Sequence, residues 1–200
     1  MSNSFTHLSI SSGYSFKYGS AHPEQLIERA AQFNMTSLAL TDQNNLAGAI
    51  RFAQSCESFG IKPILGITLS FIQKSSKITL LAKSGSLSSL YRLVSGINTN
   101  TSDGVLTIEL LERFNQYSKD LIALLGPQSV LNKNLTNRKE AAALSNYQLI
   151  KEHFDTVAIE CVSHLERSGN LRSTQAAGRS LAFAIKHQIP SVITNQVRML

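Results

Sequence analysis

The chain has 200 residues, of which 42% are hydrophobic, and it carries a formal net charge of +6 at pH 7. This length suits one domain over residues 1–200, with enough apolar residues for a sizeable core. The longest apolar runs, such as LIALLG at 121–126, are far too short to cross a bilayer, so we expect no membrane partner.

Apolar runs alternate with segments of helical period along the whole chain. In chain order, the pattern predicts strands at 5–10, 37–41, 62–71, 77–82, 120–125, 156–161 and 191–194. It predicts helices at 23–33, 46–59, 87–97, 106–114, 139–153 and 173–187. The segment NTNTSDG, 98–104, is the most loop-like. Strands mostly separated by helices indicate a parallel α/β fold, either a barrel or a doubly wound sheet.

The compartment follows from two features of the sequence. The first residues, MSNSFTH, lack the basic and then apolar pattern of a secretory signal. The two cysteines, Cys56 and Cys161, have no CxxC spacing, and we expect both to be buried, reduced thiols. These features predict a cytoplasmic protein.

The positive charge is concentrated in two windows without acidic residues. One lies between Glu57 and Asp103 and the other follows Glu166. Their basic residues are Lys62, Lys74, Lys77, Lys83 and Arg92 in the first, and Arg167, Arg172, Arg179, Lys186 and Arg198 in the second. Such windows favour DNA contact, or they are solvated faces of helices and strands. Charge alone does not decide, because there is no aromatic interleaving and no nucleic-acid motif.

Four predicted strands end in related polar segments, which are HLSISS (7–12), LTDQNN (40–45), ILGIT (64–68) and ITNQVRML (193–200). Reactive groups of α/β barrels cluster at such strand ends. In this order, the segments resemble the PHP domain (polymerase and histidinol phosphatase). The phrases GYSFKYGSAHPEQLIERAA, LALTDQNNLAGAIRFAQSC, GIKPILGITL and IPSVITNQVR extend the resemblance over nearly the whole chain. They are most similar to the N-terminal segment of bacterial C-family DNA polymerases, the DNA polymerase III alpha subunits, with the error-prone branch nearest.

The resemblance implies a distorted (β/α)7 barrel. Active PHP domains bind two or three divalent metal ions and hydrolyse phosphoesters, or proofread in some polymerases. The chain stops directly after the last predicted strand. We therefore expect the barrel's final helix to be missing, no palm, fingers or thumb to be present, and the chain to be a fragment of a longer polymerase or a truncated gene product.

The resemblance also identifies the positions that hold metal in active members. They are Ser9, Ser11, Asp42, Gln43, Thr68, Lys77, His164, Gln196 and Arg198. Ser9 and Ser11 replace the histidines of an H-x-H pair, and Gln43 replaces the histidine of a T-D-H-G-N motif. Thr68 replaces the carboxylate of G-x-E. Lys77, by a looser alignment, replaces a further histidine.

The remaining positions leave few metal donors. The closing N-D-V-H motif reads Asn195-Gln196-Val197-Arg198 and loses both its Asp and its His. Only Asp42 and His164 remain as weak candidate ligands, whereas a catalytic metal normally needs about three protein ligands. Neutral hydroxyl and amide oxygens do not offset the dehydration of a divalent cation. We therefore predict no catalytic residue, no bound metal and a vestigial site.

Other roles remain open for these residues. Asp42 precedes a helix and would cap the amides of Asn44 or Asn45, or it forms an internal ion pair with Lys77 and Arg198. His164 would bond neighbouring backbone. The alternative is a metal site for zinc, manganese or magnesium that uses Asp42, His164 and unconventional ligands.

The predicted function is structural support of a DNA polymerase in replication or translesion synthesis, with the polymerase modules of the same or a related chain as partners. One alternative is a metal-dependent phosphoesterase or exonuclease with a reduced ligand set. Another is a free-standing module that binds nucleic acid or a polymerase. Because an incomplete barrel exposes apolar seams, we also expect marginal stability or self-association.

Overall fold

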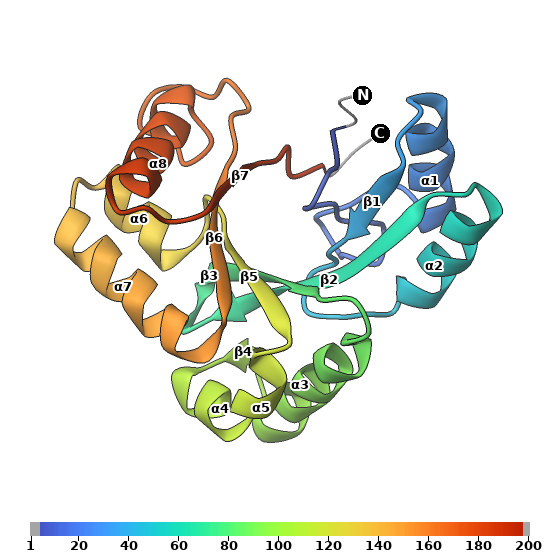
Figure 1. Ribbon diagram of the computed structural model, residues 1–200, viewed down its shortest axis with the longest axis horizontal. Coiled ribbons are helices and arrows are strands. Elements are labelled where there is room, and N and C mark those ends of the chain that lie inside the picture. Colours follow the sequence, from blue (N-terminus) through green and yellow to red (C-terminus); the bar gives the residue numbers. More distant parts are fainter. Residues whose placement is uncertain (1–4, 198–200) are drawn as a thin grey trace. The chain divides into compact units, whose positions relative to one another are not determined.

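The structure is a computed structural model that describes residues 5–197, and the chain divides into two compact units (Figure 1). Of the described residues, unit 1 comprises 5–68 and 194–197, and unit 2 comprises 69–193. The strand β2 (Lys62–Phe71) runs from the first unit into the second. The described residues form seven strands and eight helices, so the α/β class is confirmed.

Unit 1 contains α1 (Pro23–Gln32), β1 (Ser37–Leu40), α2 (Ala49–Ser58) and the first part of β2. Pro23 occupies the first turn of α1, where its missing amide costs nothing, and the His22 amide donates to Gln25 Oε1 at 2.9 Å. β1 pairs parallel with β2, from Ser37 opposite Lys62 onward. The predicted helix and strand at these positions are confirmed.

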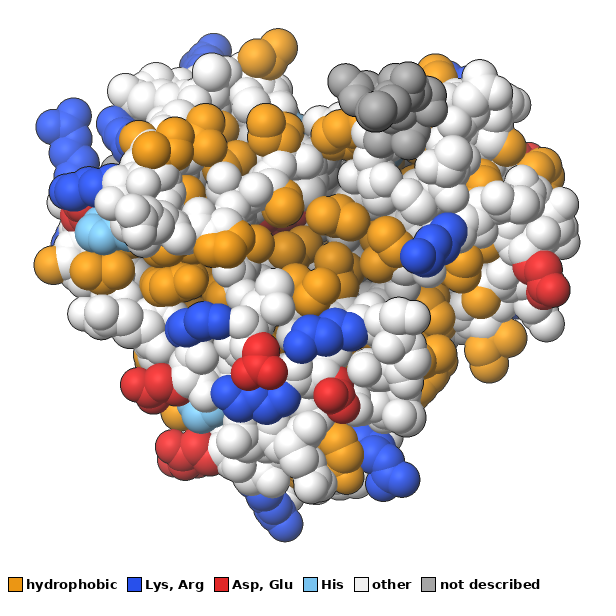
Figure 2. Space-filling view, viewed as in Figure 1, with side chains coloured by type: hydrophobic (Ala, Val, Ile, Leu, Met, Phe, Trp, Pro, Cys, Tyr) orange, Lys and Arg blue, Asp and Glu red, His pale blue; other side chains and the backbone are white. Residues whose placement is uncertain are grey.

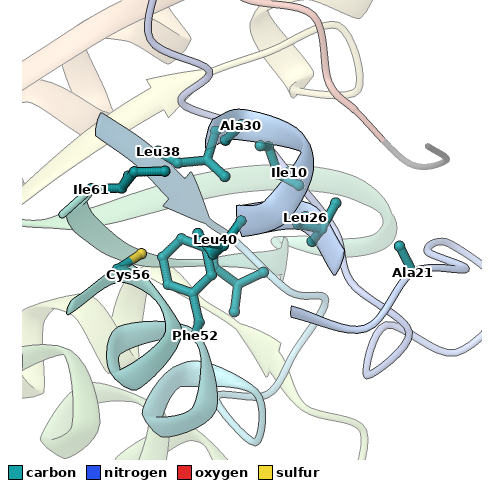
Figure 3. Close-up of a cluster of buried hydrophobic side chains, with 10 residues drawn as sticks. Ile10, Ala21, Leu26, Ala30, Leu38, Leu40, Phe52, Cys56 and Ile61 are labelled. Atoms are coloured by element: carbon teal, nitrogen blue, oxygen red, sulfur yellow. The ribbon is translucent and has the colours of Figure 1, made fainter. Parts of the chain in front are cut away.

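The core of unit 1 lies between α1, α2 and β1 (Figure 3). Phe52 and Cys56 point inward from α2, and both side chains have 0% exposure. The cluster consists of Ile10, Ala21, Leu26, Ile27, Ala30, Leu38, Leu40, Phe52, Cys56 and Ile61. Burial raises the pKa of the Cys56 thiol to about 12, so this free cysteine is an inert packing residue, as predicted.

Unit 2 contains the end of β2 and most of the remaining elements. In chain order they are β3 (Gln73–Ala82), α3 (Leu87–Asn100), β4 (Val105–Leu106), α4 (Ile108–Arg113), α5 (Asn115–Ser118), β5 (Leu121–Leu125), α6 (Val130–Thr136), α7 (Glu140–His153), β6 (Thr156–Cys161), α8 (Thr174–Lys186) and β7 (Ser191–Ile193). β5, β6 and β7 are parallel neighbours. Cys161 is buried and free, and burial followed by the charge of Glu160 raises its pKa.

The sheet is not wholly parallel. β3 follows β2 after the single residue Ile72, whose φ of 62° turns the chain back, and β3 pairs antiparallel with β5. Such a tight connection leaves no room for the crossover that parallel neighbours need. The prediction of a strictly parallel arrangement was therefore wrong at β3.

The predicted strand at 5–10 is also wrong. The segment lies along β1, because the Ala39 amide donates to His7 O at 3.0 Å and the Thr41 amide donates to Ile10 O at 2.8 Å. The Ile10 amide, however, donates to the Thr41 hydroxyl instead of to a backbone carbonyl. This side-chain bond interrupts the ladder and leaves Ile10 with an isolated bridge to Val197.

Two helix boundaries differ from the predictions. α2 begins at Ala49 instead of residue 46, because the Asn45 side chain accepts from the Ala47 amide and forms a turn first. α3 runs through Asn98–Asn100, which were predicted as loop. The Thr99 and Asn100 side chains there bond the Gly96 carbonyl. No helix within residues 5–197 is long and apolar enough to cross a membrane.

Candidate functional site: the strand ends around Asp42

Unit 1 brings six of the nine predicted site positions onto adjoining backbone segments. Segment 9–11 pairs with Val197, whose amide donates to Ser9 O and whose carbonyl accepts from the Ser11 amide, both at 3.0 Å. The end of β1 pairs with the end of β2, since the Thr68 amide donates to Asp42 O at 2.9 Å. The six positions are Ser9, Ser11, Asp42, Gln43, Thr68 and Gln196.

The Asp42 carboxylate is the chemical centre of this group. Asp42 is 2% exposed and accepts three hydrogen bonds from neutral donors. Oδ1 accepts from the Ser12 amide at 2.7 Å and from the Ser15 hydroxyl at 2.6 Å, and Oδ2 accepts from the Ser12 hydroxyl at 2.8 Å. We call Ser12, Ser15 and Asp42 the Asp42 network.

The two serine hydroxyls have fixed orientations. Ser12 Oγ also accepts from the Tyr14 amide at 3.2 Å, and Ser15 Oγ accepts from the Gln43 amide at 2.9 Å. Because a hydroxyl has one proton, each must direct that proton at Asp42. Aligned hydroxyl and amide dipoles therefore stabilise the buried negative charge, and they occupy most of the carboxylate's lone-pair sites.

Asp42 does not make the helix-capping bonds predicted for it. The Asn44 amide donates to Thr68 O at 2.9 Å, and the three donors to the Asp42 carboxylate come from the segment before α1. The capping prediction was wrong because segment 12–19 folds back onto the end of β1 and supplies donors that local sequence does not reveal.

This fold-back requires glycine at position 19. A Cβ on Gly19 would lie 2.1 Å from Ser12 O and 2.5 Å from Ser11 O, distances at which the backbone itself would have to move. Gly48 also lies close to the network, since a Cβ there would be 3.0 Å from Asp42 Oδ2. Two glycines therefore permit the close packing that encloses the carboxylate.

Beside segment 9–11 lies a pocket of about 210 Å³ in unit 1. His7 lines it with apolar residues that include Leu26, Phe33 and Met35. Nδ1 of His7 is buried without a hydrogen-bond partner among the described residues, and the Phe5 ring meets the imidazole edge-on at 4.8 Å. Burial lowers the pKa of His7, so the neutral imidazole is favoured.

Lys77 and His164 belong to unit 2. Lys77 is half-buried on β3 and donates to Ser70 Oγ at 3.0 Å. Burial, and then the charge of Lys133, lower the pKa of Lys77. Both effects disfavour the protonated form of this lysine. His164 is exposed after β6, and its backbone amide donates to Arg172 O at 2.9 Å.

Arg198 lies outside the described residues, so its predicted place in the site and its ion pair stay predictions. Within residues 5–197, no group of three or more His, Cys, Asp or Glu side chains is arranged to hold a metal ion. Around Asp42, unit 1 brings together hydroxyls, amides and one carboxylate.

Sequence reasoning did not identify Ser12 and Ser15 as partners of Asp42. A signal was nevertheless present: the run SSGYS follows the first extended segment, and Asp42 follows the neighbouring strand. Two hydroxyl-bearing residues and a carboxylate at adjoining strand ends suit each other as donors and acceptor.

Comparison with known proteins identifies the family. The model of the PHP domain matches residues 7–164. DNA polymerase III subunit alpha of Buchnera aphidicola, from Acyrthosiphon pisum, is 32% identical over 98% of this chain and 17% of its own length. The error-prone DNA polymerase of Symbiobacterium thermophilum is 43% identical over 40% of this chain and 7% of its own length. The chain thus spans about one sixth of the first relative.

Solved structures share the fold at low identity. A candidate metal-dependent phosphoesterase from Bifidobacterium adolescentis has a TM-score of 0.61 and 12% identity, covering 98% of this chain and 88% of its own. A two-domain protein from Bacteroides vulgatus with a predicted PHP-like metal-dependent phosphoesterase has a TM-score of 0.62 and 11% identity, covering 97% and 52%. These likenesses confirm the predicted fold class. From its strand-end motifs and from the match over residues 7–164, the chain belongs to the PHP domain family, and its curated relatives are DNA polymerase III alpha subunits and error-prone DNA polymerases.

Proposed function

We propose that this chain is a PHP domain that has lost its metal site and gives structural support to a DNA polymerase of the DNA polymerase III alpha type. The observation that carries the proposal is the Asp42 network. The one carboxylate retained from the T-D-H-G-N motif accepts from Ser12 and Ser15 at 2.6–2.8 Å. Hydrogen bonds from neutral donors of the chain itself, instead of a metal ion, stabilise the negative charge of Asp42.

The other positions support the same interpretation. Ser9, Ser11, Gln43, Thr68 and Gln196 offer only neutral oxygens and nitrogens where active members are expected to offer imidazoles and carboxylates. Such groups compensate poorly for the water that a divalent cation must lose. The residues of unit 1 therefore do not fit a catalytic metal cluster, and no hydrolytic step is assigned to them.

The relatives support the proposed supporting role. The sequences that match are DNA polymerases, and this chain corresponds to a small part of each. Its partners in this proposal are polymerase modules of the same or a related chain, acting in the cytoplasm during replication or translesion synthesis. The polymerase chemistry would then be carried by those modules.

A chimera tests this role. The matching N-terminal segment of the Buchnera DNA polymerase III subunit alpha is replaced by this chain, and primer extension is measured. We expect a folded chimera with DNA synthesis within about tenfold of the parent. A folded chimera that synthesises no DNA would count against structural support.

The alternative is a metal-dependent phosphoesterase, and the structural likeness to proteins described in those terms favours it. Asp42 and His164 would then be ligands. Hydrolysis of bis-p-nitrophenyl phosphate with zinc, manganese or magnesium separates the two proposals. Turnover that is lost in Asp42→Asn and in His164→Gln would support the phosphoesterase, whereas activity at the level of the buffer supports the scaffold.

A further inference from the structure

The outer face of α8 in unit 2 combines aliphatic side chains with unpaired positive charge. A pocket of about 300 Å³ lies there, and its apolar lining residues are Leu135, Ala182 and Phe183. Its basic lining residues are Arg138, Arg179 and Lys186. In Figure 2, basic and apolar side chains lie next to each other in the region where Figure 1 places α8.

The apolar part continues beyond the pocket. Leu181 is 38% exposed and Ile185 is 70% exposed. Residues three and four apart share a face of a helix, so these two side chains lie together beside Ala182. Gly178, one turn earlier, has open space where a Cβ would be. We call Gly178, Leu181, Ala182, Ile185 and the pocket the α8 face.

Among the described residues, the positive charge of the α8 face is only partly balanced. Glu140 is the one acidic residue that lines the pocket, and it already bonds Lys186 Nζ at 2.6 Å and His187 Nε2 at 3.0 Å. Arg179 donates to the Thr136 carbonyl at 3.3 Å. Within residues 5–197, neither Arg138 nor Arg179 has a carboxylate within ion-pair distance. Both guanidiniums thus remain available for an acidic ligand.

From this combination we propose that the α8 face docks an acidic segment of a partner protein, bound as a helix with aliphatic side chains spaced three and four residues apart. Its aliphatic side chains pack on Ala182 and Ile185, and one enters the pocket. Its carboxylates pair with Arg138 and Arg179. This is the binding mode of an amphipathic helix in a groove, with charge complementarity that selects an acidic sequence.

Two other occupants fit less well. Single-stranded nucleic acid binds through stacking on open aromatic faces, but Phe183 is 4% exposed and its ring packs on His187 at 4.5 Å. A second copy that used the same face would bring its own arginines against these, because a two-fold contact pairs identical patches. Aliphatic side chains beside guanidiniums match an acidic peptide better than they match single-stranded nucleic acid or a second copy of this chain.

The test uses the full chain and a fluorescent peptide of about 16 residues, with leucines at helical spacing and glutamates elsewhere. We expect a micromolar Kd that weakens as salt rises from about 0.05 to about 0.5 M. Replacing the leucines by serine, or the glutamates by glutamine, should weaken binding about tenfold or more.

Variants locate the site. Ile185→Ser and Arg138→Asn should each weaken peptide binding about fivefold or more. Asn also tolerates the φ of 58° at position 138. The matched controls are Ile50→Ser, on the 67% exposed Ile50 of α2, and Lys62→Gln on exposed Lys62, and both should leave the Kd unchanged. Circular dichroism and thermal melting verify that every variant is folded.

Three results would overturn the inference. One is equal affinity for the acidic peptide in the two α8-face variants and in the controls. Another is tighter binding of an oligothymidine of about 20 nucleotides than of the peptide, with loss in Arg138→Asn, which would assign the face to nucleic acid. The last is concentration-dependent self-association that Ile185→Ser abolishes, which would assign it to a second copy. None of these depends on the polymerase role, which the chimera tests separately.

Discussion

The Asp42 carboxylate accepts the Ser15 hydroxyl at 2.6 Å across a separation of 27 residues in the sequence. With the two bonds from Ser12, this contact fastens the segment before α1 to the end of β1. The bonds are buried, and each donor would be costly to leave without an acceptor. The Asp42 carboxylate thus serves as an internal hydrogen-bond acceptor in this fold.

Removing the carboxylate should therefore destabilise the fold in the absence of any metal. Asp42→Ala leaves two hydroxyls and one amide without their acceptor, at about 1–3 kcal/mol each. We expect a loss of at least about 3 kcal/mol in the free energy of unfolding, measured by urea denaturation in the presence of a chelator. Ser15→Ala should lose about 1–2 kcal/mol.

The matched control for the serines is Ser20→Ala at an exposed position of the same segment, which should change stability by less than about 0.5 kcal/mol. If wild-type protein and Asp42→Ala unfold at the same urea concentration, the network does not stabilise the fold. If the wild type loses stability only when chelator is added, Asp42 acts through a metal.

Glycine at position 19 should be essential for the same fold-back. Gly19→Ala places a Cβ 2.1 Å from Ser12 O, and the backbone that holds the network must shift. We expect a loss of about 2–4 kcal/mol by thermal or urea unfolding. Gly13→Ala is the control, because its Cβ would meet Ala21 O at an ordinary 3.5 Å, and a loss there equal to that of Gly19→Ala would refute the steric argument.

Much of this architecture was predictable from local sequence. The proline and helical period of 23–33 predicted α1, and the apolar runs at 62–71 and 156–161 predicted β2 and β6 with their observed bounds. These elements have strong patterns because most of their buried side chains are apolar. α6 was missed, since its seven residues include four that are polar and only the Ser129 cap marks its start.

The parts that were mispredicted depend on contacts between distant residues. The predicted strand at 5–10 does not form because the Ile10 amide donates its hydrogen bond to the Thr41 hydroxyl. The predicted capping role of Asp42 was wrong because its carboxylate instead accepts hydrogen bonds from Ser12 and Ser15, which lie in the segment before α1. The family motifs indicated candidate site positions, but they did not indicate the hydrogen bonds that Ser12 and Ser15 make with Asp42.

Acid should weaken the fold through His7. Burial lowers its pKa below the ordinary value of about 6.5, so the unfolded chain takes up a proton at a higher pH than the folded protein does. The stability from neutral His7 is thus complete above about pH 6.5 and falls as pH decreases through the folded pKa. Urea unfolding midpoints measured between about pH 7.5 and pH 5 give the slope of stability against pH. This range brackets the ordinary pKa of a free histidine side chain.

The comparison is between His7→Gln and His22→Gln. His7→Gln should flatten the decline in stability below about pH 6.5, because the buried titrating group is gone. His22 is exposed at the start of α1, and its replacement should leave the decline as in the wild type. Identical slopes in all three proteins would contradict a contribution from His7.

Restoring the family's donors should restore metal binding. The variant Ser9→His, Ser11→His, Gln43→His, Thr68→Glu adds imidazoles and a carboxylate on adjoining segments of unit 1. We expect at least one zinc ion per chain, because three or more such ligands suffice. Ser11→His alone is the control and should bind no stoichiometric zinc. A folded quadruple variant without zinc would show that these positions do not converge as the backbone pairing indicates.

The central claim is that the unaltered chain has too few charged and imidazole donors at these strand ends to hold a metal cluster. The most direct test is the metal content of protein that has been equilibrated with zinc, manganese or magnesium and then desalted, together with its melting temperature. We predict less than about 0.1 ion per chain and no shift in Tm, since no binding energy stabilises the fold. Two ions per chain, with a rise in Tm that Asp42→Asn abolishes, would contradict the account.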